Sequence, residues 1–418
     1  MKIPFQSAAR KRVVAVVVVL GALVYSAEAG RLFVASFLGD RVQLRALQLA
    51  ARLDPGSADY RNHLGRYYDL IGRDPGTALG YYQAAVQLNP HSARFWFDLA
   101  GAYQVLGDTL NQTRALEQAI YADAMTPDVA WEAANLYLVQ GQPEKALREF
   151  SVVIANDPGL GPTALQLCWR INPDVDSLLR YVVPHTADAY IPFLELLENK
   201  GDVAGTFKVW DALYQTREPF DRRYVYEYLN FLIKTKQVDE AVKVWQQAAP
   251  RFGIPSYLPT SDNLIVNPTF NLDVLNGGFD WQYAKQPGVT LTLDPSDFHS
   301  GRRSLVIAFD GPSINDAGIY QYVAVQPNTT YDFSAYYKNS DFEGAGAPHL
   351  TVQDMYTQAI YYDSDELNQA GFWKSVDGEF TTGADCKLVV VHVRRLPAGS
   401  PIRGKLWIDD LHLAKKSS

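Results

Sequence analysis

Three hydropathy patterns follow one another along the chain. Residues 13–25 read VVAVVVVLGALVY, a continuous apolar run without a polar face. From residue 40 to residue 255, apolar positions recur with the 3.6-residue period of amphipathic helices, and from residue 262 onward apolar and polar positions alternate as in half-buried strands. We therefore expect an N-terminal hydrophobic helix, an all-α region and an all-β region.

The apolar run follows a basic segment, residues 1–12, which contains four Lys and Arg side chains and no acidic one. By the positive-inside rule, this segment stays in the cytoplasm and the rest of the chain is exported. Because helical sequence continues, we expect residues 13–38 to be an uncleaved single-pass anchor in the cell inner membrane, with the bulk of the chain in the periplasm. The alternative is a removable signal peptide, since Ala27-Glu28-Ala29 fits a small-x-small cleavage site.

Small and aromatic residues recur through residues 40–255 with a period of about 34. Small residues let the two helices of a hairpin approach, and aromatic residues fill the space between hairpins. The pattern resembles the tetratricopeptide repeat, which implies stacked helical hairpins whose groove holds a partner protein, here one of the envelope. Two units that match position by position contain Leu64, Gly65, Tyr68, Ala78, Tyr82 and Ala85, and Ala133, Ala134, Tyr137, Ala146, Phe150 and Val153.

Prolines 250, 255 and 259 end the helical pattern, and we place a linker at residues 256–261. Beyond it, eight short alternating segments predict strands, which is typical of a jelly-roll sandwich. The expected fold is thus multidomain, an all-α tetratricopeptide-like solenoid over 40–255 followed by an all-β jelly-roll sandwich over 262–418. The strands are expected at 291–293, 304–309, 318–325, 330–337, 350–353, 374–380, 387–393 and 405–413.

The all-β region also carries a second resemblance. Its opening Asn263-Leu-Ile-Val-Asn-Pro-Thr-Phe270, Gly278-Phe-Asp-Trp281 and closing Ile408-Asp-Asp-Leu411 resemble the galactose-binding-like jelly rolls of carbohydrate-binding modules. Such a module binds sugar with aromatic faces and a few polar groups in a concave trough. The aromatic candidates are Trp281, Tyr283, Tyr320, Tyr322, Tyr336 and Tyr356.

Among these candidates, Tyr320 and Tyr322 are two residues apart and therefore share one face of a strand. For each aromatic residue the alternative role is packing in the core. The same resemblance implies a structural calcium ion as a candidate cofactor, with Asp409 as the closing acidic ligand. Asn271 stands where the family commonly has a glutamate. Because calcium prefers six to eight oxygen ligands, this replacement lowers the expected affinity.

Charge and composition narrow the functional classes. The chain has 38 Lys and Arg against 46 Asp and Glu, so we expect no nucleic acid partner. The two cysteines, Cys168 and Cys386, lie in different predicted regions, so a structural disulfide is not expected. Seven histidines are scattered without a metal or catalytic spacing, which argues against an enzyme.

We expect a non-enzymatic envelope scaffold in which the helical groove holds a partner protein and the sandwich binds polysaccharide. The family resemblance associates such proteins with exopolysaccharide or cell-surface assembly. Two alternatives stay open: an adaptor whose sandwich is a structural cap without glycan affinity, and, more weakly, a glycan-active enzyme that would use a pair of acids such as Asp354 and Asp363.

Overall fold

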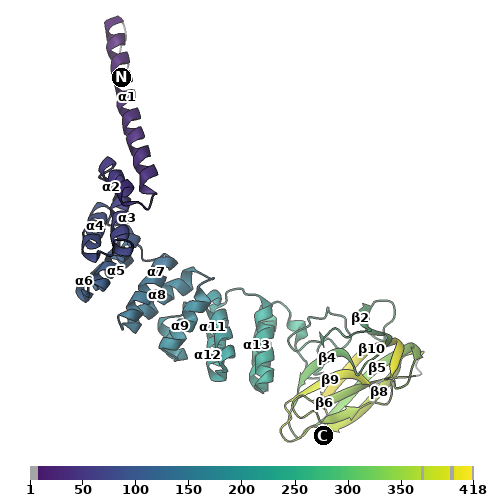
Figure 1. Cartoon of the computed structure of the whole chain (residues 1–418). Helices are drawn as coiled ribbons and strands as arrows, with labels where there is room; N and C mark the ends of the chain where they lie inside the picture. Colours follow the sequence, from purple (N-terminus) through teal and green to yellow (C-terminus); the bar gives the residue numbers. More distant parts are fainter. Residues whose placement is uncertain (1–7, 369–370, 396–399, 417–418) are drawn as a thin grey trace. The chain divides into compact units, whose positions relative to one another are not determined.

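The computed structural model describes residues 8–368, 371–395 and 400–416, and it consists of a helical region followed by an antiparallel β-sandwich (Figure 1). The chain divides into two compact units, Met1–Leu196 with Lys208–Leu213, and Leu197–Phe207 with Tyr214–Ser418. The second unit joins the last helices of the chain to the sandwich. This arrangement confirms the predicted fold class.

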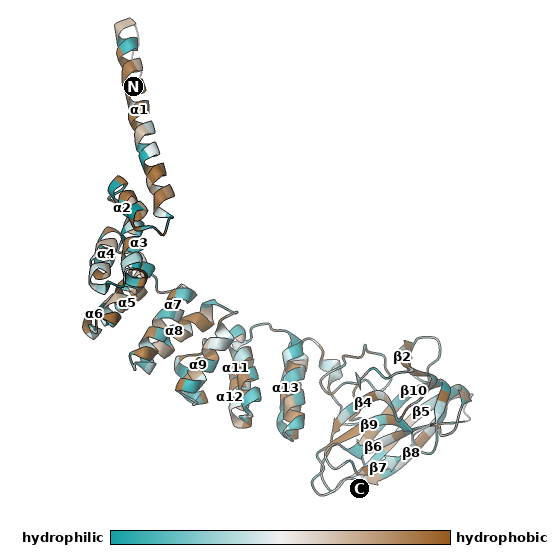
Figure 2. Ribbon diagram, viewed as in Figure 1, coloured by the Kyte–Doolittle hydropathy of each residue, from teal (hydrophilic) through white to brown (hydrophobic). Residues whose placement is uncertain are grey.

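The first helix, α1 (Ala8–Gly39), is long and apolar enough to cross a membrane, and much of its ribbon has the brown colour of hydrophobic residues in Figure 2. Its last turns pack against the helices that follow. Ala35 and Gly39 are buried, and a Cβ at Gly39 would lie 2.2 Å from the Tyr60 ring. His63 Nδ1 also lies 3.2 Å from the Gly39 carbonyl oxygen. The C-terminal end of α1 is therefore part of the helical packing.

Consecutive helices pair as hairpins, for example α3 with α4, α5 with α6 and α7 with α8. Several second helices start at an aspartate: Asp74, Asp108 and Asp202 each accept a hydrogen bond from the backbone N–H three residues later. The helices are α2 (Leu44–Leu53), α3 (Ala58–Leu70), α4 (Pro75–Leu88), α5 (Ala93–Val105), α6 (Thr109–Ala122), α7 (Pro127–Val139), α8 (Pro143–Asn156), α9 (Gly161–Ile171), α10 (Val175–Tyr181), α11 (Ala187–Lys200), α12 (Val203–Thr216), α13 (Arg222–Lys234) and α14 (Val238–Arg251).

The small residues of the repeating pattern lie where helices meet. Ala78, Ala85 and Ala100 are fully buried, and Gly65 lies so close to Tyr82 that a Cβ there would be 2.6 Å from the ring. Tyr82 is itself buried, so the aromatic ring fills the space that the glycine leaves open. The 34-residue spacing thus has a packing cause.

The sandwich consists of two five-stranded sheets with antiparallel pairing throughout. Sheet A has the order β1-β4-β9-β6-β7 and sheet B the order β2-β3-β10-β5-β8. The strands are β1 (Gln282–Tyr283), β2 (Val289–Asp294), β3 (Ser304–Ser313), β4 (Asp316–Ala324), β5 (Thr330–Glu343), β6 (Pro348–Asp354), β7 (Ile360–Asp363), β8 (Lys374–Thr381), β9 (Leu388–Arg395) and β10 (Pro401–Lys415). All eight predicted strands are present, and the short edge strands β1 and β7 were not predicted.

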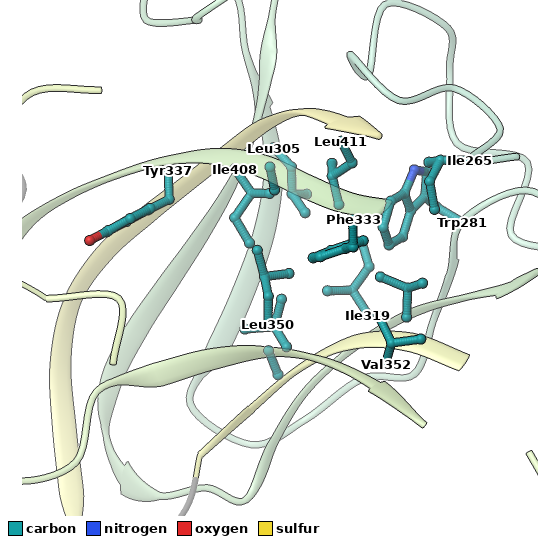
Figure 3. Close-up of a cluster of buried hydrophobic side chains, with 14 of the residues drawn as sticks. Ile265, Trp281, Leu305, Ile319, Phe333, Tyr337, Leu350, Val352, Ile408 and Leu411 are labelled. Atoms are coloured by element: carbon teal, nitrogen blue, oxygen red, sulfur yellow. The ribbon is translucent and has the colours of Figure 1, made fainter. Parts of the chain in front are cut away.

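The core of the sandwich lies between the sheets (Figure 3). Ile319 and Val352 project into it from sheet A, and Phe333 and Ile408 project from sheet B. Successive side chains of a strand point to opposite faces, so β5 buries alternate residues toward the core, whereas β6 is buried over its whole length. Side chains between the core positions of sheet A therefore point to its other side.

Within the second unit, the hairpin α13–α14 packs against the sandwich through a glycine pair. A Cβ at Gly277 would lie 2.5 Å from the Tyr226 ring, and one at Gly278 would lie 2.6 Å from the Trp245 ring. Trp245 is buried and its Nε1–H donates to the Tyr257 carbonyl at 2.9 Å. Only residues without a side chain allow this close approach of backbone to aromatic rings.

Candidate functional site

The candidate site is the outer face of sheet A, the face that points away from sheet B. On β4, Ile319 and Val323 belong to the core, so Tyr320 and Tyr322 point outward. The rings of these two tyrosines meet edge to face, with centroids 5.2 Å apart. The side chains of this face on the central strands β4, β9 and β6 include Tyr320, Tyr322, Val390, His392, Arg394, Thr351 and Gln353.

One row of side chains crosses this face from strand to strand. The register pairs Gln282 with Tyr320, Tyr320 with His392, and His392 with Thr351. Tyr320 donates its hydroxyl hydrogen to Gln282 Oε1 at 3.2 Å, which holds the ring at one end of the row. An aromatic ring followed by hydrogen-bonding side chains is the combination that sugar recognition uses.

His392 has an oriented ring. Its Nδ1 lies 3.0 Å from Asp316 Oδ2, so the carboxylate fixes the ring and makes Nδ1 the donor. His392 is 6% exposed, and its buried Nε2 has no hydrogen-bond partner within the described residues. An unpaired buried acceptor has a free-energy cost that a ligand hydroxyl would remove.

Tyr322 lies at the end of the outer face that α14 covers. It lines a small cavity of about 50 Å³ together with Val242 and Gln246 of α14. Burial, more than any neighbouring group, raises the pKa of the Tyr322 hydroxyl. Tyr320 is partly exposed, whereas His392 and Thr351 beyond it in the row are 6% and 0% exposed. Tyr322 contributes both to the face and to its contact with the last hairpin.

The other predicted aromatic residues do not join this face. Trp281 is 2% exposed and packs on Phe270 in the core, with ring centroids 5.2 Å apart. Tyr283 follows Gln282 on β1 and therefore points to the opposite side, where it is 49% exposed. The sequence could not separate these two from Tyr320, because their orientation depends on how β1 pairs with β4.

Tyr336 and Tyr356 lie elsewhere in the sandwich. Tyr336, on β5 of sheet B, is stacked on His299 with a centroid distance of 3.5 Å. The Tyr356 hydroxyl donates to the Ile233 carbonyl of α13 at 2.8 Å, and the Lys236 ammonium lies 5.3 Å from its ring centroid. Of the six candidates, the structure thus brings only Tyr320 and Tyr322 together.

The residues assigned to calcium by resemblance do not fit a calcium ion. Asp409 is fully buried, and its Oδ2 accepts the backbone N–H groups of His299 and Ser300 at 2.8 Å each, while Oδ1 accepts a third N–H. Asn271 Oδ1 accepts the Arg302 N–H at 2.7 Å. These oxygens face N–H hydrogens, whereas calcium requires their lone pairs.

A guanidinium cation also lies beside this segment. Arg303 donates from Nε to the Phe270 carbonyl at 2.6 Å and from Nη2 to Asp273 Oδ1 at 2.8 Å. It therefore uses a carbonyl oxygen of the opening segment, which is the kind of ligand that a calcium ion would need. The loop 299–303 ties the opening segment to the closing strand by hydrogen bonds and by the Arg303–Asp273 ion pair.

The acidic residues considered for catalysis have structural partners. Asp354 Oδ1 accepts the N–H groups of Tyr356 and Thr357, at 2.7 and 2.8 Å, and so stabilises a turn. Asp363 Oδ1 lies 3.4 Å from His349 Nδ1 at the edge of sheet A. A glycosidase would need two acids that face one scissile bond, and Asp354 is held in a turn by its two N–H donors.

His392 and Arg394 were missed by the sequence analysis. A signal was present: Leu388–Arg395 reads LVVVHVRR, and of its three polar side chains those at 392 and 394 lie at alternate positions and so share one face of an otherwise apolar strand. In a strand buried on both sides, such a pair marks a polar stripe on one face.

Comparison with known proteins gives a family match for the sandwich. Residues 262–397 match the family model described as a carbohydrate binding domain, so the C-terminal sandwich is a domain of the carbohydrate-binding-module type, a non-catalytic class. No curated protein matches the chain.

Several solved structures are similar to parts of the chain. A structure described as "CBM4 structure and function" is 16% identical and covers 36% of this chain and 99% of that chain, with a TM-score of 0.29. A CBM61 module solved in complex with β-1,4-galactotriose is 18% identical and covers 37% of this chain and 100% of that chain, with a TM-score of 0.28. The crystal structure of MamA protein is 22% identical and covers 42% of this chain and 96% of that chain, with a TM-score of 0.31.

Proposed function

We propose that this protein is a membrane-tethered, non-enzymatic scaffold whose C-terminal sandwich binds polysaccharide on the outer face of sheet A. The observation that carries the proposal is the row of Gln282, Tyr320, His392 and Thr351 across that face. The family match at residues 262–397 supports a glycan as its ligand.

The chemistry of this row suits a sugar ring. The C–H groups of a pyranose pack on an aromatic face, here that of Tyr320, while its hydroxyl groups need hydrogen-bond partners beside the ring. His392 Nε2 is such a partner, since it is unpaired among the described residues. Cross-strand pairing and Asp316 hold His392 in place, and its buried Nε2 must be uncovered before a ligand hydroxyl can reach it.

The N-terminal part would place the sandwich outside the cytoplasm. The basic segment 1–12 stays on the cytoplasmic side, and α1 acts as a retained single-pass anchor in the inner membrane. The packing of Gly39 on Tyr60 supports retention, because the end of α1 contributes to the first helical contacts.

The helical hairpins would act as tetratricopeptide-like repeats that hold an envelope protein. Side chains of successive first helices are bonded to one another, as Arg66 of α3 forms a bidentate pair with Asp98 of α5 at 2.7 and 2.8 Å. Such bonds fix neighbouring hairpins and would pre-form a groove for a partner. The resemblance stated for the whole chain suggests a role in exopolysaccharide or cell-surface assembly, in which both binding functions would be used.

The proposal is tested by affinity electrophoresis of the detergent-solubilised full-length protein in gels that contain neutral or acidic polysaccharides. We expect at least one polysaccharide to retard the protein, and Tyr320→Ala to abolish the retardation. Tyr283→Ala is the matched control, because Tyr283 is exposed on the other side of the same sheet. Migration unchanged by every polysaccharide would exclude glycan binding.

A second candidate function is that of a protein adaptor whose sandwich only caps the helical repeats. The packing of the sandwich on the last hairpin favours this candidate. Gly277 lies against Tyr226 and Gly278 against Trp245, so the sandwich covers α13 and α14. The two functions differ in one result: a cap without glycan affinity would show no retardation by polysaccharide, while the partner protein would still co-purify with the helical region.

A further inference from the structure

We infer that the outer face of sheet A takes an acidic polysaccharide, with the carboxylate of a uronic acid residue paired to Arg394. This inference rests on the proposed glycan function of the face and adds the chemical class of the ligand. It starts from the position of Arg394 on β9, two residues after His392 and therefore on the same face.

The guanidinium of Arg394 extends along the sheet toward the sugar row. Arg394 Nη1 donates to Gln353 Oε1 at 2.8 Å, and Gln353 is paired with Val390, four residues from Arg394 along β9. Four residues of a strand span about 13 Å, so the two long side chains must meet between their own positions. The meeting point lies alongside His392 and Thr351, the row that contains Tyr320.

Arg394 has spare hydrogen-bond donors. A guanidinium carries five N–H groups, and within the described residues Arg394 forms one side-chain hydrogen bond, to the neutral Gln353, and no ion pair. The nearby carboxylates have other partners: Asp316 accepts from Gly318 N–H and pairs with His392, and Asp363 faces His349. Asp316 lies opposite Arg394 in the β4–β9 register, but among the described residues its ion-pair partner is His392, so the Arg394 guanidinium keeps donors for a further anion.

The adjacent Arg395 shows what a structural arginine looks like in the same strand. It is 2% exposed and points to the other side of the sheet. Its guanidinium donates to the carbonyl oxygens of Ala345, Gly346 and Ser400 at 2.6 to 2.8 Å. Arg395 therefore fixes loops, whereas Arg394, which is partly exposed, keeps its donors for solvent or a ligand.

Three groups then match three parts of a uronic acid residue. The Tyr320 ring packs on the sugar C–H groups, and His392 Nε2 accepts a hydrogen bond from a hydroxyl group. The Arg394 fork binds the carboxylate through two parallel N–H···O bonds, a geometry in which arginine and carboxylate are complementary. A neutral sugar would use the first two contacts and leave the guanidinium without an anion.

The test compares acidic polysaccharides with their own carboxyl-reduced forms, in which each carboxylate has become a primary alcohol. Polygalacturonate, alginate and hyaluronate are titrated into the detergent-solubilised full-length protein by calorimetry, each beside its reduced form, with xylan and mixed-linkage glucan as neutral polymers. We expect at least one acidic polymer to bind about tenfold or more tightly than its reduced form, which corresponds to about 1.4 kcal/mol.

Variants separate this inference from the proposed function. Arg394→Gln should remove the preference for the acidic polymer and leave the weaker affinity for the reduced one. Arg394→Lys should retain part of the preference, because lysine keeps the positive charge but cannot form the two parallel hydrogen bonds of the guanidinium. Arg403→Gln, an exposed arginine of sheet B, should change nothing. Thermal unfolding of each variant reports whether it folds like the parent.

Salt gives an independent measurement. Affinity of the parent for the acidic polymer should fall as the ionic strength rises, and that of Arg394→Gln should not. Equal affinity for acidic and reduced forms, or binding of neutral polymers alone, would overturn the inference and leave the glycan function intact. Absence of binding to every polymer would overturn both.

Discussion

Tyr320 and His392 are cross-strand neighbours on β4 and β9, and both point to the outer face of sheet A. One supplies an aromatic ring and the other a buried nitrogen without a partner among the described residues. Backbone pairing fixes the relative positions of both residues before any ligand binds. The relationship gives the glycan proposal a defined place on the molecule.

The two tyrosines of β4 should differ in what they affect. Tyr320→Ala should lower glycan affinity by about tenfold, since the ring is lost from the sugar row, and should cost less stability than the loss of Tyr322. Tyr322→Ala should destabilise the protein by about 1–3 kcal/mol, because Tyr322 lies against α14. Calorimetric titration and denaturant unfolding of both variants check this pair of outcomes. An unchanged stability of Tyr322→Ala would remove the argument that α14 covers this end of the face.

How much of the sandwich could be predicted from the sequence depends on the length of each strand. Alternation over six to fifteen residues located the longer strands, whereas β7 has four residues and β1 has two, too few for an alternation to be recognised. The orientation of Trp281 and Tyr283 follows from the pairing of β1 with β4, which no local pattern encodes. The Tyr320 and Tyr322 pair was predictable, because both lie within one long strand.

Gly278 should be intolerant of a side chain. It has φ of 66°, in the left-handed region, and a Cβ would meet the Trp245 ring at 2.6 Å. Gly278→Ala is therefore expected to destabilise the second unit by about 2 kcal/mol or more. Gly101→Ala is the control: that glycine lies within α5 with open space around it, so alanine should be neutral or stabilising. Equal unfolding midpoints for the two variants would contradict the packing of the sandwich on α14.

Stability should depend on pH through Asp280. This residue is fully buried, Oδ2 accepts the Leu275 N–H at 2.7 Å, and burial raises the pKa of its carboxyl group to about 7. In the unfolded chain the pKa is about 4, so the folded state binds more protons between these values. The contribution of Asp280 to the free energy of unfolding is complete below pH 4. It is lost as the pH rises to about 7, by up to about 1.4 kcal/mol per pH unit.

Asp280→Asn should remove this part of the pH dependence, because the amide does not titrate. Guanidinium denaturation followed by tryptophan fluorescence between pH 4 and 8 measures the effect, with the exposed Asp262→Asn as the control. If Asp280→Asn and the parent lost stability in parallel over this range, another group would be responsible.

The opening segment of the sandwich should depend on Arg303 rather than on calcium. Arg303→Ala should lower the unfolding free energy by about 1–3 kcal/mol, since it removes bonds to Phe270 and Asp273. Arg302→Ala should have little effect, because Arg302 contributes its backbone N–H to Asn271 and that group remains. Calcium and a chelator should leave the thermal midpoint of the parent unchanged. A midpoint that rises with calcium concentration would contradict the assignment of this segment.

The central claim is that polysaccharide binds the outer face of sheet A. Hydrogen–deuterium exchange with mass spectrometry, on full-length protein with and without a polysaccharide that retards it, locates the binding face directly. We predict slower exchange in peptides that cover Asp316–Ala324 and Leu388–Arg395, the strands β4 and β9, and no change over Thr330–Glu343 of sheet B. Protection of sheet B instead, with β4 and β9 unaffected, would contradict the account.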